Sequence, residues 1–280
     1  MALTRKRKRK IKSAVIFTVV LLVVLIDLIP IVLILLNSLR TNAQVSSALF
    51  AIPTELHWEN YAHVFVTGEY LYSYLLNLIL GIGAVLLTEI LVLLSAYGIV
   101  KMNAYGSNFF TGYFLVSMSV PVFGILIPLF FAYVRMGLNN TIIGLVLLFT
   151  AINIPFSYLL VRSYLIGVSK EMNEAAEIDG ANTFQVLTKI ILPLCMPIMA
   201  TIALVVFTST WNNFQIPNIF YSSAEHKLIS MNFYRFIGKV SSDLAYIFTA
   251  AVLAMLPILI LYFSSQKSFI EGMTQGSVKG

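Results

Sequence analysis

Four carboxylates lie within nine residues of an otherwise apolar chain, at Glu171, Glu174, Glu177 and Asp179. The 280 residues are 59% hydrophobic and only 11% charged, so such a concentration of acid is unusual. Carboxylates form charge-assisted hydrogen bonds with arginine or lysine of another chain. Two adjacent alanines among the acids would let a second backbone approach closely. The stretch is therefore predicted to be a docking surface for a protein partner.

Local signals predict that this stretch begins with a short helix and a sharp turn. Ser169 can cap the helix. Met172, Ala175 and Ala176 then share one face at i, i+3, i+4 spacing. Gly180 suits the position just after a helix, where a positive φ costs glycine little.

A second helix is predicted to begin at Asn182, with Gln185 three residues later as a variant of the capping box. It presents Phe184, Leu187 and Ile191 at helical spacing. The turn into the next apolar segment is assigned to two prolines, Pro193 and Pro197. The alternatives are an ordinary solvated loop or a helix lying on lipid headgroups. The second is disfavoured, because headgroup-bound helices are usually basic.

The rest of the chain predicts an all-α polytopic membrane protein with six transmembrane helices. The mean hydropathy is +0.89, and an apolar run of about 20 residues crosses the hydrocarbon core as a helix. The sequence has no polar and apolar alternation typical of a β-barrel, and lipid permits only helices or closed barrels. The six candidate spans are 13–36, 71–100, 109–134, 141–161, 196–220 and 244–265.

Basic residues predict that both termini are cytoplasmic. This orientation places thirteen Lys and Arg residues inside and five outside, as the positive-inside rule requires. The run after the basic N-terminus is too long for a secretory signal, so we expect it to remain as the first span. The expected parts are a cytoplasmic N-terminus at 1–12, a transmembrane domain at 13–265 and a cytoplasmic tail at 266–280. The acidic stretch then belongs to a loop at about 163–193, between spans four and five.

Several classes of site are disfavoured. Cys195 is the one cysteine, and the three histidines lack metal-ligand spacing, so no metal site is expected. The sequence contains no G-x-x-x-x-G-K-[ST] phosphate loop, and no nucleophile and base stand at a recognisable catalytic spacing. The basic N-terminal run lacks interleaved aromatics and adjoins a span, which indicates lipid headgroups and no nucleic acid.

Polar and aromatic residues in two spans are candidates for a substrate path. Amides are costly where they face lipid, and sugar hydroxyls suit amides and aromatic faces. The candidates flank Pro155 in the fourth span or occupy the middle of the fifth: Asn153, Phe156, Ser157, Tyr158, Trp211, Asn212, Asn213 and Gln215. The alternative role is hydrogen bonding between helices without substrate contact.

Asp27 and Glu89 are the two carboxylates inside predicted spans. Intramembrane acids carry protons or sodium in many secondary carriers. They leave open an alternative, an ion-coupled secondary sugar carrier, in which neutralising Glu89 would abolish transport.

The acidic loop also resembles a known family. The pattern E-A-A, three residues, G, nine residues, I-x-L-P is similar to the signature loop of permease subunits of ATP-binding-cassette (ABC) importers. The matching residues are Glu174, Ala175, Ala176, Gly180, Ile190, Leu192 and Pro193, with Asp179 and Ala181 as common companions. The segments 118–145, 211–217 and 266–280 resemble the carbohydrate-importer branch, in particular the second maltose permease subunit type. Asn213 departs from that branch, where an acidic residue often stands.

The resemblance implies a non-catalytic permease subunit that forms half of a path for a carbohydrate, with an oligosaccharide favoured. The loop would insert into a cytoplasmic ATPase as a coupling helix, and ATP and Mg would be bound by that ATPase and not by this chain. The implied partners are a second homologous permease, two ATPase subunits, an extracytoplasmic solute-binding protein and membrane lipid. The implied location is a bacterial or archaeal cell membrane. The glycines of the tail, Gly272, Gly276 and Gly280, would reach toward the ATPase dimer interface.

Overall fold

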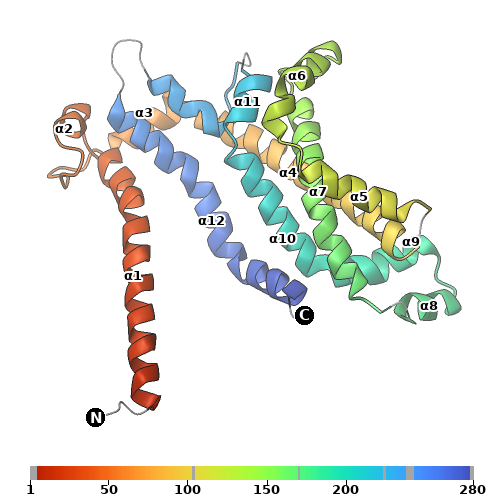
Figure 1. Cartoon of the computed structure of the whole chain (residues 1–280). Helices are drawn as coiled ribbons and strands as arrows, with labels where there is room; N and C mark the ends of the chain where they lie inside the picture. The colour runs from red at the N-terminus through yellow and green to blue at the C-terminus, as the bar shows by residue number, and fades with distance from the viewer. Residues whose placement is uncertain (1–4, 103–104, 170, 223–224, 238–242, 278–280) are drawn as a thin grey trace. The chain divides into compact units, whose positions relative to one another are not determined.

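A computed structural model describes residues 5–102, 105–169, 171–222, 225–237 and 243–277 (Figure 1). All elements assigned in these ranges are helical, which confirms the all-α class. The chain divides into two compact units. One comprises residues 1–70 and 232–255, and the other comprises residues 71–231 and 256–280.

Within the described ranges, five helices are long and apolar enough to cross a membrane, or six if one bent pair counts as a single span. The predicted polytopic architecture is thus confirmed. The five are α1 (Arg5–Ser38), α4 (Tyr70–Val100), α7 (Ile142–Ile166), the helix that α9, η2 and α10 form together, and α12 (Leu244–Ser277). The tail expected at 266–280 continues α12 as far as Ser277, and Gly280 lies outside the described residues.

The third predicted span, 109–134, is broken rather than straight. It consists of α5 (Ser107–Met118), η1 (Val122–Ile125) and α6 (Leu126–Arg135), and the two halves meet at an angle of 90°. The break falls at Pro121, which is extended with φ −68° and ψ 117°. Proline lacks an N–H and disfavours helical conformation in the residue before it, so the helix ends there.

The fifth predicted span, 196–220, has different boundaries. A single 29-residue helix runs from Thr183 to Trp211 through α9 (Thr183–Val186), η2 (Leu187–Ile191) and α10 (Leu192–Trp211). The expected turn at Pro193 and Pro197 is therefore wrong. The η2 segment is a π-helical turn, and widening the helix just before Pro193 relieves the clash of its ring with the preceding turn. The chain then breaks after Trp211 and forms α11 (Gln215–Phe220).

The unit that contains residues 1–70 includes two short helices, α2 (Asn42–Ser47) and α3 (Glu59–Thr67). A buried arginine bonds to several groups of this unit. Arg40 is only 4% exposed. Its guanidinium donates to Asn37 Oδ1 at 2.8 Å, to Ala48 O at 2.7 Å and to Gln44 O at 2.6 Å. These bonds satisfy the charge with neutral acceptors, so the polar loop after α1 can be buried.

A buried asparagine on α3 completes this arrangement. The Asn60 amide donates to Ser38 O at 2.9 Å and to Arg40 O at 3.0 Å. The Thr249 hydroxyl of α12 also donates to Ser38 O, at 3.0 Å. The carbonyls left open at the C-terminal end of α1 therefore find side-chain donors.

The core of the other unit lies around α7, which contacts both α5 and α10 (Figure 1). Phe149, Leu165 and Ile202 are almost fully buried in it. Thr141 caps α7, accepting a hydrogen bond from the N–H of Gly144 at 3.0 Å. This packing fixes the ends of α7 and α10, which carry the segments considered next.

Candidate functional site

The predicted short helix is present as α8 (Glu171–Ile178). It lies within residues 163–193, which are called the coupling segment from here on. The Ser169 hydroxyl accepts from the N–H of Glu171 at 3.2 Å, as its predicted capping role requires. Gly180 has φ +84°, which confirms the expected turn. The N–H of Ala181 bonds to the Ala176 carbonyl at 2.9 Å, the bond that closes a Schellman motif. The turn therefore follows from local chemistry.

The predicted capping box is also present. Asn182 Oδ1 accepts from the N–H of Gln185, and Gln185 Oε1 accepts from the N–H of Asn182, both at 2.9 Å. The predicted shared face of the second helix is wrong, however. Leu187 and Ile191 are buried, whereas Phe184 is 72% exposed. Phe184 lies one turn before the π-helical segment and faces outward, while Leu187 and Ile191, at the two ends of that segment, face the core.

The outward surface of the coupling segment is apolar as well as acidic. Ile178, at the end of α8, is 86% exposed, and Met172 and Ala175 are also exposed. Asp179 and Gly180 lie exposed at the turn. Ala176 is only 9% exposed, so the predicted Ala-Ala pair presents one residue outward and one inward. Glu174 is part of α8, and its side chain lies outside the described residues.

The sequence analysis missed Ile178 and Phe184 as surface anchors. These two large apolar side chains lie exposed on either side of the Gly180 turn, where a docked partner would contact them. The signal was available, because Ile178 is the residue before the Schellman cap and cannot continue the helical face. The prediction rested on the acidic residues of the same stretch.

Hydrogen bonds fix the base of the coupling segment to neighbouring helices. The Tyr164 hydroxyl of α7 donates to the Leu194 carbonyl of α10 at 2.7 Å. The Lys101 ammonium donates to the Val168 carbonyl at 2.6 Å. Three further residues of the predicted signature lie in or beside η2: Ile190 and Leu192 pack against the core, and Pro193 is exposed. The base of the segment is thus bonded to α10 and to the residue that follows α4.

The predicted path residues of α7 are placed in two environments. Asn153 is half-buried, donates to Phe149 O at 2.7 Å and accepts from the Ser209 hydroxyl of α10 at 3.2 Å. Phe156 is 41% exposed. Ser157 and Tyr158 are buried: the Tyr158 hydroxyl lies 3.0 Å from Thr111 Oγ1, and its ring packs on Phe114. Within this chain, Asn153 and Phe156 are accessible, Tyr158 joins α7 to α5, and the buried Ser157 hydroxyl has no hydrogen-bond partner among the described residues.

The path residues of the fifth span were expected in its middle. They lie instead at its end, where the helix breaks after Trp211. Trp211 is 3% exposed and stacks on Phe207, with ring centroids 5.5 Å apart. Asn213 Oδ1 accepts from the N–H of Ile216 at 2.9 Å and so supports α11. Asn212 and Gln215 are exposed. The two exposed amides border the break, where Asn213 holds the following helix.

The bend between α5 and α6 encloses a hollow of about 420 Å³ that the sequence analysis did not anticipate. Its polar lining is supplied by Tyr113, Ser117 and Tyr133, and Pro155 of α7 closes it. Tyr113 and Ser117 lie in α5 and Tyr133 lies in α6, so their convergence depends on the 90° bend. The combination of Pro121 with the polar residues around it was the available signal.

Among the described residues, no hydrogen bond joins Asp27 or Glu89 to a path residue. Asp27 is exposed on α1, and Glu89 is half-buried on α4. Among the described residues, no group of three metal-ligating side chains comes together.

Comparison with known proteins gives a consistent result. The family model for the inner membrane component of binding-protein-dependent transport systems matches residues 90–275. The chain is 29% identical over 252 residues to a probable ABC transporter permease protein, YurM, of Bacillus subtilis, covering 90% of this chain and 83% of that protein. It is 26% identical to the diacetylchitobiose uptake system permease protein NgcG of Streptomyces coelicolor, covering 91% and 85%.

The fold is also similar to that of a chain in the crystal structure of a bacterial ABC transporter that imports the acidic polysaccharide alginate. The TM-score is 0.80, and the match covers 96% of this chain and 99% of that one at 24% identity. A likeness at this identity concerns the fold.

Proposed function

This chain belongs to the family of inner membrane components of binding-protein-dependent transport systems, and we propose from that premise that it forms half of the translocation path for a carbohydrate. An oligosaccharide is the favoured substrate. The relatives support this choice, since one is named for diacetylchitobiose uptake and the structural neighbour imports alginate. Exposed amides and an aromatic ring at Asn212, Gln215 and Phe156 offer the polar and apolar contacts that a sugar needs.

The observation that carries the proposal is the continuous helix from Thr183 to Trp211. At about 1.5 Å of rise per residue, its 29 residues cover about 43 Å. One end begins at the capped turn beside Gly180, and the other ends at the break that carries Asn212. A movement imposed on the turn would therefore be delivered to the amide-bearing end.

The energy source in this proposal is a separate ATPase. Two ATPase subunits bind ATP and Mg, and this chain is non-catalytic and binds no cofactor. The coupling segment inserts into one ATPase through Ile178, Phe184 and the acids around them. Closure of the ATPase dimer then switches the spans between inward-open and outward-open states as rigid bodies. A second homologous permease supplies the other half of the path, and an extracytoplasmic solute-binding protein delivers the sugar.

Orientation follows from the charge distribution. Thirteen Lys and Arg residues fall on the side expected to be cytoplasmic and five on the other, which supports cytoplasmic termini in a bacterial or archaeal cell membrane. Anionic headgroups on that side attract the same residues.

The test is uptake of radiolabelled oligosaccharides by proteoliposomes that contain this chain with its co-purifying partners. We expect uptake that requires ATP on the ATPase side and the solute-binding protein on the other. A Glu89→Gln variant should retain ATP-dependent uptake. Uptake that proceeds without ATP and is lost in Glu89→Gln would overturn the proposal.

A further inference from the structure

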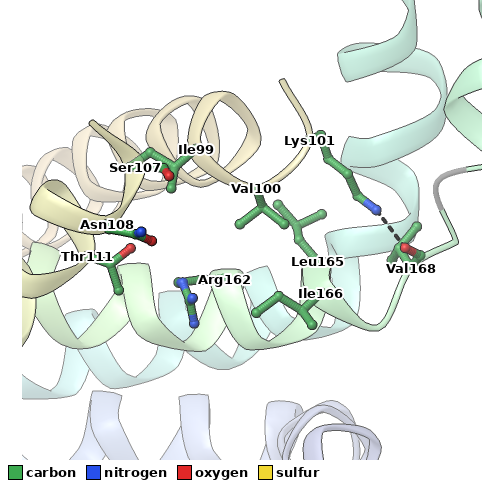
Figure 2. Close-up of a pocket in the computed structure, with 10 residues that line it drawn as sticks. All are labelled: Ile99, Val100, Lys101, Ser107, Asn108, Thr111, Arg162, Leu165, Ile166 and Val168. Carbon is green, nitrogen blue, oxygen red and sulfur yellow. Dashed lines mark hydrogen bonds between the residues drawn. The ribbon is translucent and has the colours of Figure 1, made fainter. Parts of the chain in front are cut away.

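A polar cavity of about 280 Å³ lies where α4, α5 and α7 meet, close to the start of the coupling segment (Figure 2). Its polar lining comes from Lys101, Ser107, Asn108, Thr111 and Arg162, and its remaining walls are aliphatic. Among the described residues that line it, none carries a carboxylate. Two cationic side chains therefore border one small cavity, Lys101 and Arg162.

Arg162 is the residue that most needs a ligand. It projects from α7 into the cavity, and its Nε is buried without a hydrogen-bond partner among the described residues. A buried cationic donor without a partner is costly. The arginine of the other unit shows the contrast, since Arg40 is satisfied by three neutral acceptors. The Nε–H of Arg162 is thus available to an anion.

The donors beside Arg162 suit an anion with several oxygens. Asn108 and Thr111 of α5 line the same part of the cavity (Figure 2). Thr111 shares a hydrogen bond with Tyr158, which fixes its orientation. The first turn of α5 begins at Ser107 without a side-chain cap, so its N–H groups add positive potential.

Lys101 adds a second positive charge at another part of the wall. Its ammonium is held by the Val168 carbonyl at 2.6 Å, which positions the charge at the cavity. A guanidinium with a nearby ammonium, an amide and hydroxyls is the donor set that binds phosphate oxygens.

We propose that this cavity binds a phosphate group, carried either by an anionic phospholipid or by a free phosphorylated solute. The volume suits a phosphate with a few attached atoms and is too small for an oligosaccharide. The cavity lies at the ends of two spans, the level at which basic pockets between helices meet lipid headgroups. It does not depend on which sugar is transported.

Occupation of the cavity would act on the coupling segment. Val168 lines the cavity, accepts the Lys101 hydrogen bond and directly precedes Ser169, the cap of α8. A phosphate bound by Arg162 of α7 and by Asn108 and Thr111 of α5 would fix the end of α7 against α5. The ligand would therefore stabilise the base from which the coupling segment projects.

The test uses the purified complex in a neutral detergent, titrated in parallel with short-chain phosphatidylglycerol, with short-chain phosphatidylcholine and with glycerol phosphate. Binding is measured as the rise in melting temperature and by native mass spectrometry. Arg162→Gln removes the guanidinium charge, Arg162→Lys keeps a cation, and Arg135→Gln is the control at an exposed arginine. We expect Arg162→Gln to bind at least about tenfold more weakly, since charge-assisted bonds are lost, with Arg162→Lys intermediate and Arg135→Gln unchanged.

The three titrations distinguish a phosphate carried by a lipid headgroup from one carried by a free solute. Tighter binding of phosphatidylglycerol than of phosphatidylcholine, with little effect of glycerol phosphate, identifies a lipid headgroup. Saturable binding of glycerol phosphate with the same dependence on Arg162 identifies a free solute. Equal responses of Arg162→Gln and wild type to all three compounds overturn the proposal, provided that the variant elutes as the intact complex.

Discussion

Two polar segments of this chain solve opposite problems. The segment after α1, residues 37–70, buries its polar groups: Arg40 and Asn60 are 4% and 6% exposed and bond to its own backbone. The coupling segment, residues 163–193, leaves Ile178 and Phe184 86% and 72% exposed. Both segments expose large apolar side chains, including Phe50 and Ile52 in the first, so the difference lies in the buried polar network that only the first segment shows among the described residues.

The difference indicates which segment contributes its shape to the stability of the protein. Hydrogen bonds within the 37–70 segment satisfy its buried polar groups, so loss of its conformation should destabilise the protein. The shape of the coupling segment comes from two caps and one glycine turn, and its exposed apolar side chains gain free energy when another chain covers them. Variants in the two segments should therefore fail in different assays.

The largest expected effect comes from the exposed anchors. The double variant Ile178→Ser and Phe184→Ser should weaken ATPase binding by about a hundredfold, because each large side chain contributes about 1.5–3 kcal/mol when buried. Co-purification of the ATPase subunits with the permease measures this loss.

The matched control lies in the other segment. Phe50 and Ile52 are 74% and 77% exposed, and replacing both by serine should leave ATPase co-purification unchanged. Equal loss in the two double variants would show that general apolar exposure, and not the coupling segment, holds the ATPase.

A smaller effect, on stability alone, is expected from Arg40→Leu. The substitution leaves Asn37 Oδ1 and two backbone carbonyls without their donor, which should cost about 3 kcal/mol. Arg235→Ala breaks an ion pair with Glu69 at 2.8 Å between partly exposed side chains and should cost at most about 1 kcal/mol. Thermal unfolding followed by tryptophan fluorescence compares them, and similar costs would refute the buried network.

The smallest effect is a pH dependence in the first segment. Hydrogen bonds from its own backbone and from the His57 side chain, 2.6 Å away, hold the pKa of Glu59 below its ordinary value. The stabilisation is present above the unfolded pKa and is lost as pH falls through the lowered folded pKa. Glu59→Gln should thus melt slightly lower than wild type at neutral pH, with the difference disappearing in acid. A constant difference across pH, or the same profile in the exposed Glu55→Gln control, would contradict this assignment.

The features that the sequence predicted correctly are local. Ser169, Gly180 and the Asn182 and Gln185 pair act through bonds to residues at most five positions away. Such caps are determined by residue type and spacing alone. The apolar spans were equally predictable, because lipid leaves the chain few alternatives.

The features that the sequence did not predict depend on helix phase and tertiary packing. The π-helical turn at 187–191 lies inside one helix that joins the expected second short helix to the fifth span, and Phe184 lies on the outward side of that helix. The bend at Pro121 creates the hollow near Pro155, since it brings together side chains from three elements. Proline indicated where these distortions occur but did not determine their geometry.

The most direct test of the account is ATPase stimulation and sugar uptake in proteoliposomes with Gly180→Val and Gly180→Asn. A Cβ at Gly180 meets no atom within 4 Å, so a substitution acts through its φ of +84° and not through a clash. Asparagine tolerates this conformation and valine does not. We predict that Gly180→Asn couples like wild type, while Gly180→Val loses about tenfold or more of both activities and still docks the solute-binding protein. Normal coupled transport by Gly180→Val would contradict the claim that this turn transmits the work of ATP hydrolysis.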